Sequence, residues 1–134
     1  MSKIFFLKTL KEDKFLHTSI ILDYVNSSTI RLTYELGELR IIEEDMYPFF
    51  ALTKIRAELE KSGLVILCKG ARRDVYPSGM SAIGIKAYEL EFDKQATKLV
   101  DIFDEEMNIE KISSIAEQKF YRDNWLKSLN NTSK

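Results

Sequence analysis

The side chains best suited to chemistry lie in one segment, residues 69–84, between two patterns typical of strands. An apolar run precedes it at 64–68 and an alternating pattern follows it at 88–92. The candidate binding residues of this segment combine cationic, acidic, phenolic and hydroxyl groups: Lys69, Arg72, Arg73, Asp74, Tyr76 and Ser78. Arginine and lysine donate hydrogen bonds to anions, and glycines such as Gly70 and Gly79 let a backbone approach a ligand closely. These residue types therefore predict an anion-binding site.

The same segment also fits a loop that is ordered by its own side chains. Arg72 or Arg73 could pair with Asp74, while Tyr76 and Met80 could pack beneath the loop. Residues 76–79, Tyr-Pro-Ser-Gly, match a type I turn with proline at its second position. No GxxxxGK[ST] motif is present, so the segment is not a P-loop. Both interpretations stay open, because long ordered loops either carry function or are simply packed.

Two short acidic clusters offer a second kind of candidate site. One contains Glu43 and Glu44, and the other contains Glu105 and Glu106. Carboxylates at strand ends and helix starts are usually solvated, but such a cluster can also steer a basic partner by raising the rate of encounter. We therefore include these four glutamates among the candidate partner-binding residues.

Residue counts disfavour a metal site or a histidine-activated nucleophile. The chain has one histidine, His17, and one cysteine, Cys68, and no spacing brings them together. We therefore predict no catalytic residues, no metal ligands and no cofactor. The 20 basic and 21 acidic side chains give a net charge of -1, whereas a general nucleic-acid binder usually has a basic excess. Nucleic acid is not an expected partner.

The hydrophobic patterns predict an α+β fold. Alternation and β-branched runs predict strands at 4–7, 18–25, 29–36, 38–43, 64–68, 88–92 and 97–103. Apolar residues at helical spacing predict one helix over 46–62 and another that begins near 114. Since the second, third and fourth strands follow one another closely, we expect them to form a meander in a largely antiparallel sheet. Both helices should pack on this sheet, with residues 1–134 as a single domain.

Local signals mark where the two helices begin and end. Asp45 is placed to cap the first helix, and Pro48 lies in its first turn. Gly63 suits a left-handed residue after the last turn, with Leu59 and Leu64 in contact across it. Ser114 and Glu117 have the spacing of a capping box, which predicts the start of the second helix.

No pattern typical of export or membrane insertion is present. The apolar run at 4–7 is too short for the core of a signal peptide, and no run has the length needed to cross a bilayer. Cys68 lies in the most apolar run, which favours a small buried residue in a reducing compartment. We expect a cytoplasmic protein without a membrane partner.

Residues 70–80, Gly-Ala-Arg-Arg-Asp-Val-Tyr-Pro-Ser-Gly-Met, resemble the Gly-x-Arg-x-x-Val-Tyr-Pro-Ser-Gly-Met segment of a group of small uncharacterised bacterial proteins. The resemblance extends to residues 86–88 and 100–103. Proteins of this group resemble immunity proteins that are encoded beside contact-delivered or secreted toxins. The resemblance implies a non-enzymatic protein that neutralises a cognate bacterial toxin by occlusion. The alternative is a small-molecule or nucleotide-binding, enzyme-like domain that uses residues 69–84.

Overall fold

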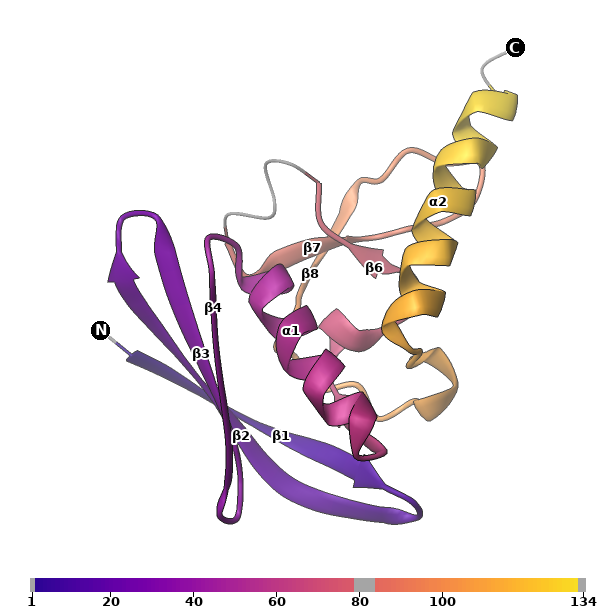
Figure 1. Ribbon diagram of the computed structural model, residues 1–134. Coiled ribbons are helices and arrows are strands. Elements are labelled where there is room, and N and C mark those ends of the chain that lie inside the picture. Colours follow the sequence, from indigo (N-terminus) through magenta and orange to yellow (C-terminus); the bar gives the residue numbers. More distant parts are fainter. Residues whose placement is uncertain (1, 79–83, 133–134) are drawn as a thin grey trace.

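The computed structural model describes residues 2–78 and 84–132, and it has an α+β fold with two antiparallel sheets and two α-helices (Figure 1). A single hydrophobic core cluster contains residues of both sheets. The sequence predicted one sheet, whereas the strands divide into a five-stranded and a three-stranded sheet. Among the described residues, no helix is long and apolar enough to cross a membrane.

Four consecutive strands form the meander of the larger sheet. They are β1 (Ser2–Lys11), β2 (Lys14–Asn26), β3 (Thr29–Leu36) and β4 (Leu39–Asp45). β5 (Leu64–Leu67) pairs with the other side of β1, which gives the order β4-β3-β2-β1-β5. A tight turn joins β1 to β2, because the paired strands continue through Lys11 and Lys14. Glu12 adopts a left-handed φ of 56° to make this turn.

The first helix, α1 (Pro48–Lys61), begins later than the sequence predicted. Asp45 is not its N-cap, because Tyr47 occupies that position and no side chain caps it. Asp45 Oδ1 instead accepts a hydrogen bond from the Tyr47 amide over 3.0 Å. The predicted left-handed residue after the last turn is confirmed, because Gly63 has a φ of 69° and donates to the Glu60 carbonyl. Leu59 and Leu64, on either side of it, are both buried.

The smaller sheet and the second helix complete the chain. η1 (Lys69–Ala71) leads to β6 (Val75–Tyr76), β7 (Lys86–Glu89) and β8 (Lys98–Asp101), which pair in that order. η3 (Ile109–Lys111) precedes α2 (Ile115–Thr132). The capping box is confirmed, because the Glu117 amide donates to Ser114 Oγ and the Ser114 amide donates to Glu117 Oε1.

The two helices pack in different places. α1 lies across the five-stranded sheet, in contact with β3, β4 and β5, and separates that sheet from α2 (Figure 1). α2 contacts β6 of the three-stranded sheet and α1, so the two helices pack on different sheets. Tyr121 and Trp125 of α2 are half-buried, and Tyr121 stacks on Phe92 with 4.8 Å between ring centroids. Met80 and the end of the predicted 76–79 turn lie outside the described residues.

Candidate functional site

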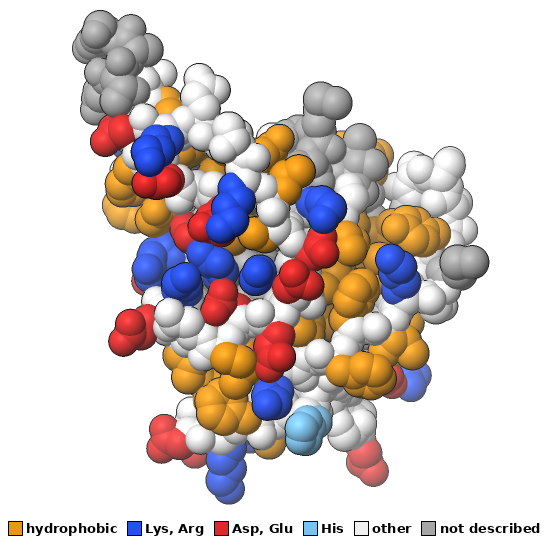
Figure 2. All heavy atoms as spheres, turned by 180° about the vertical axis from the view of Figure 1, so that it is seen from behind, with side chains coloured by type: hydrophobic (Ala, Val, Ile, Leu, Met, Phe, Trp, Pro, Cys, Tyr) orange, Lys and Arg blue, Asp and Glu red, His pale blue; other side chains and the backbone are white. Residues whose placement is uncertain are grey.

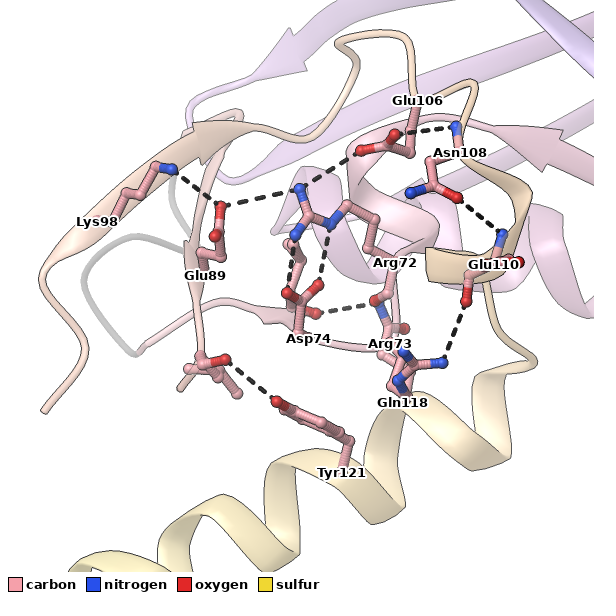
Figure 3. Close-up of polar contacts among 12 residues, drawn as sticks. Arg72, Arg73, Asp74, Glu89, Lys98, Glu106, Asn108, Glu110, Gln118 and Tyr121 are labelled. Carbon is pink, nitrogen blue, oxygen red and sulfur yellow. Dashed lines mark hydrogen bonds and ion pairs between the residues drawn. The ribbon is translucent and has the colours of Figure 1, made fainter. Parts of the chain in front are cut away.

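Arg72 of the 69–76 segment is buried at the centre of an ionic cluster (Figure 3). Its Nε donates to Asp74 Oδ1 over 2.9 Å, and its Nη2 donates to Oδ2 over 2.7 Å. Its Nη1 lies 3.4 Å from a carboxylate oxygen of Glu106 and 3.8 Å from one of Glu89. A bidentate pair of this kind is among the stronger hydrogen-bonded arrangements in proteins. The structural interpretation of the loop predicted an arginine paired with Asp74, and for Arg72 this is confirmed.

The charges around Arg72 leave it little capacity for a further anion. Burial by itself lowers the pKa of Arg72, but the hydrogen bonds and charge of Asp74, together with the charges of Glu89 and Glu106, raise it overall. Lys98 Nζ lies 3.5 Å from Glu89 and adds a second cation. Three carboxylates therefore face two cations, and the cluster has a net negative charge that would repel an anionic ligand.

Gln118 of α2 holds the backbone of the 69–76 segment from beneath. Its side-chain amide nitrogen lies 2.9 Å from the carbonyl oxygen of Gly70, 2.8 Å from that of Arg72 and 3.0 Å from that of Val75. Its Oε1 accepts a hydrogen bond from Arg56 Nη1 over 2.6 Å, and Arg56 Nη2 donates to the Ser113 carbonyl. Burial lowers the pKa of Arg56, so these acceptors are what make the buried cation tolerable. No sequence pattern had indicated this role for Gln118 or Arg56.

Arg73 and Lys69 have different surroundings from Arg72. Arg73 is exposed, its amide donates to the Lys111 carbonyl over 2.9 Å, and its guanidinium donates to the Glu110 carbonyl over 3.3 Å. The guanidinium groups of Arg72 and Arg73 point apart (Figure 3). Lys69 is half-buried and donates its amide to the Asp104 carbonyl over 2.8 Å. The predicted cations are thus not brought together around one point.

The space beside Gly70 is filled by the protein itself. A Cβ built on Gly70 would lie 2.7 Å from Leu52 Cδ2 and 3.0 Å from Ile102 Cβ. Real Cβ atoms do not approach other atoms this closely, so the absence of a side chain at Gly70 allows α1 and the 102–104 segment to pack against the loop. The close approach predicted for a ligand is therefore made by other parts of the chain.

The four candidate glutamates lie in separate places. Glu43 and Glu44 are on β4, the terminal strand at one end of the five-stranded sheet, where successive side chains point to opposite faces. Glu44 pairs with Arg31, with 2.6 Å between the charged atoms. Glu105 forms an isolated bridge with Cys68, next to the strand at the other end of that sheet, and Glu106 joins the Arg72 cluster. The two acidic clusters are therefore not combined into one patch.

A pocket of about 420 Å³ lies beside Tyr76 and Ser78. Its lining includes the aromatic residues Tyr88 and Trp125. Among the described lining residues the cation is Arg122, whose guanidinium carbon lies 5.3 Å from the centre of the Tyr76 ring. Tyr76 also packs against α1, with 5.2 Å between its ring centroid and that of Phe49. Neither Arg72 nor Arg73 lines this pocket. Two of the candidate residues thus reach a pocket, but without the predicted arginines.

The five-stranded sheet has an apolar face that turns away from α1, here called the outer face. Along β1 and β2, the buried residues alternate with residues of this face: Leu7 and Ile20 enter the core, whereas their neighbours do not. Ile4 pairs with Ile21, Ile21 with Thr33, and Thr33 with Ile42, which makes one row across four strands. On β1, β2 and β4 the apolar side chains of the outer face include Ile4, Phe6, Leu10, Phe15, Ile21 and Ile42.

These outer-face side chains are unusually accessible. Phe6 is 81% exposed, and Ile4 and Ile42 are more than half exposed. The charged neighbours largely pair with one another, as Arg31 does with Glu44 and Arg40 with Glu35. Seen from behind the molecule, hydrophobic side chains lie among charged ones over this part of the surface (Figure 2). The solvated face of an antiparallel sheet is normally polar, so exposed phenylalanine and isoleucine indicate a surface with another use.

A signal for the outer face was present in the sequence. Ile4, Phe5, Phe6 and Leu7 place bulky apolar residues on both faces of β1, a pattern typical of a strand inside a sheet. β1 is indeed flanked by β2 and β5, but no described element covers Phe6. The excess of apolar residues was therefore a sign of an exposed apolar face as well as of a central strand.

The single cysteine and the single histidine lie in different surroundings. Cys68 is fully buried, and burial raises the pKa of its thiol to about 11. His17 is exposed on β2. Within residues 2–78 and 84–132, no group of three or more His, Cys, Asp or Glu side chains could hold a metal ion.

No protein-family model matches this sequence, and no curated protein matches it at a significant level.

Proposed function

We propose that this protein is a non-enzymatic binding protein that neutralises a bacterial toxin by covering part of the toxin's surface. The observation that carries the proposal is the outer face of the five-stranded sheet, where Phe6 is 81% exposed and Ile4 and Ile42 of the same face are more than half exposed. Burying one such side chain in an interface contributes roughly 1.5 to 3 kcal/mol. The resemblance of residues 70–80 to proteins of the immunity type supports the same class of function.

The candidate loop fits this proposal through its structural role. Arg72 and Asp74 are engaged with each other, and Gln118 holds the loop carbonyls. The loop then serves as a rigid support that joins the two sheets and α2, while the partner binds elsewhere. In this proposal the protein acts in the cytoplasm, where a delivered toxin would have its target.

The test is survival of cells that express each gene flanking the gene of this protein. We expect one flanking product to be toxic and the wild-type protein to restore growth and to co-purify with it. Phe6→Glu should abolish both effects, because it places a charge in the apolar interface. Phe120→Glu is the matched control, since Phe120 is 69% exposed but lies on α2. If no flanking product is toxic, or if a toxic one is neither bound nor neutralised, the proposal fails.

The pocket beside Tyr76 and Ser78 favours a second candidate, a small-molecule binding protein. Aromatic walls with one arginine suit a planar anion such as a nucleotide, which would stack on Trp125 and pair with Arg122. In that case ATP, GTP or NAD should raise the melting temperature of the wild type, and Arg122→Gln should remove the effect. Absence of any shift across such a panel would leave the toxin-binding function as the better explanation.

A further inference from the structure

A groove runs beside the outer edge of β5, the terminal strand of the five-stranded sheet. Its volume is about 330 Å³, and β5 contributes Leu64, Val65 and Ile66 to one wall. Ile109 and Ile112 form apolar parts of the other side. At this point the edge of the sheet is open, because no described strand pairs with β5 on the side away from β1.

Residues 104–106 pair with the chain at the end of β5, and the residues after them turn away from this edge. The Glu106 amide donates to the Leu67 carbonyl, and the Lys69 amide donates to the Asp104 carbonyl, as in a short antiparallel strand. The Asn108 amide then turns back to Glu106 Oε2, and the Glu110 amide donates to Asn108 Oδ1 at the start of η3. An added strand would therefore lie alongside residues 64–66 and run antiparallel to β5, as residues 104–106 do.

The charges at the groove select the type of segment that fits. Glu60 and Glu117 line it and are exposed. Arg56 is the cation of the described lining, but it is 4% exposed and donates to Gln118 and to the Ser113 carbonyl. The accessible charge is therefore negative, which complements lysine or arginine on a bound segment.

We propose that this groove binds an extended segment of a partner protein, which adds to β5 as a further strand. An unpaired strand edge offers backbone donors and acceptors at the spacing of a peptide, and an adjacent apolar pocket selects a side chain. The segment places an apolar side chain against Ile109 and Ile112 and a basic residue near Glu60 and Glu117. The inference rests on the proposed function for the identity of the partner, which would be the toxin. Leu10 lines the groove and also belongs to the outer face, so the two surfaces are continuous.

The test uses a random peptide library displayed on phage and selected on the intact protein, and it needs no toxin. We expect enriched peptides to share an apolar residue next to Lys or Arg. They should also protect from hydrogen exchange the amide of Val65, the residue of 64–66 whose backbone faces away from β1. Ile109→Lys should weaken their binding about tenfold or more, because it adds a cation and a bulky polar group to the groove. Phe120→Lys, an exposed position outside the groove, should leave binding unchanged.

Several outcomes would overturn this inference. They are a selection that enriches no peptide, peptides that bind the Ile109→Lys variant as well as the wild type, and protection at residues other than 64–66. Dimerisation of the protein that Ile109→Lys abolishes would show that a second copy occupies the edge, and would also overturn it. A failed toxin screen with a successful peptide selection would reject the immunity function and keep the groove as a peptide site.

Discussion

Arg56 of α1 donates a hydrogen bond to Gln118 of α2 over 2.6 Å, inside the protein and across 62 positions of the sequence. Through this contact, one amide side chain connects both helices to the 69–76 segment, because the nitrogen of Gln118 faces three carbonyl oxygens of that segment. The loop that has the most reactive side chains in the sequence is thus held in place by residues that looked unremarkable.

Replacement of Gln118 by leucine should strongly destabilise the protein. Leucine removes one acceptor of a buried arginine and the donor to the loop carbonyls, and a buried polar group left without its partner costs roughly 1 to 3 kcal/mol, or more where the group is charged. Urea denaturation would measure the free energy of unfolding. Lys119→Ala, an exposed change on the same helix, should stay within about 0.5 kcal/mol of the wild type. Equal stabilities for the two variants would mean that the contact with Arg56 is not formed.

Replacement by alanine should affect stability much more at Arg72 than at Arg73. Arg72→Ala leaves Asp74, Glu89 and Glu106 facing one another and should reduce stability by about 1 to 3 kcal/mol. Arg73→Ala removes an exposed side chain and should change stability by less than about 0.5 kcal/mol. Thermal unfolding of the two variants makes the comparison. A larger loss for Arg73 than for Arg72 would contradict the assignment of Arg72 as the structural arginine.

Ile66 tests whether β5 is a core strand despite its terminal position. It is 1% exposed and belongs to the core cluster, so Ile66→Ala should cost roughly 2 to 5 kcal/mol in the free energy of unfolding. Val65→Ala, at the half-buried neighbour, should cost less. Urea melts of both variants provide the measurement. A loss for Ile66→Ala below about 0.8 kcal/mol, the value of one buried methylene, would show that the strand is exposed.

Because the thiol of Cys68 is buried, the protein should lose stability at alkaline pH. Its ordinary pKa of 9.0 applies in the unfolded chain, whereas burial raises the pKa to about 11 in the folded protein. Between these values the unfolded chain releases the proton first, so the stabilisation is complete below pH 9 and falls as the pH rises towards 11. The free energy of unfolding should decline over this range, and less steeply in Cys68→Ala. Burial also raises the pKa of Tyr34, so the difference between wild type and variant isolates the thiol. Identical slopes would argue against a buried thiol.

The acidic residues should influence association rather than stability. Replacement of Glu43, Glu44 and Glu105 by glutamine should slow association with the toxin found in the growth test and flatten its salt dependence. Glu106→Gln is a separate case, because Glu106 lies 3.4 Å from Arg72 and its loss should lower stability. Stopped-flow association at several salt concentrations would measure the first effect. Unchanged rates would place these residues outside the path of encounter.

Features that depend on near neighbours in the sequence were determined by the sequence itself. The alternation in 29–36, the ending at Gly63 and the capping box of Ser114 and Glu117 each involve residues a few positions apart, and each is present in the structure. The incorrect prediction of Asp45 as the helix cap also depends on near neighbours. A carboxylate two residues before Tyr47 can accept a hydrogen bond from its amide without being the first residue of the helix.

Only the tertiary structure decided which of the possible partners each charged residue takes. Arg72 could have bound a ligand, but packing brings Glu89 and Glu106 to it from 17 and 34 positions away. The roles of Arg56 and Gln118 exist only when α1, α2 and the loop meet, because apart from the bond between these two side chains their acceptors are backbone carbonyls that any residue could supply. The outer face was likewise undetermined, since an apolar side chain in a strand enters a core or faces solvent according to what packs over it. For Phe6, no described element packs there.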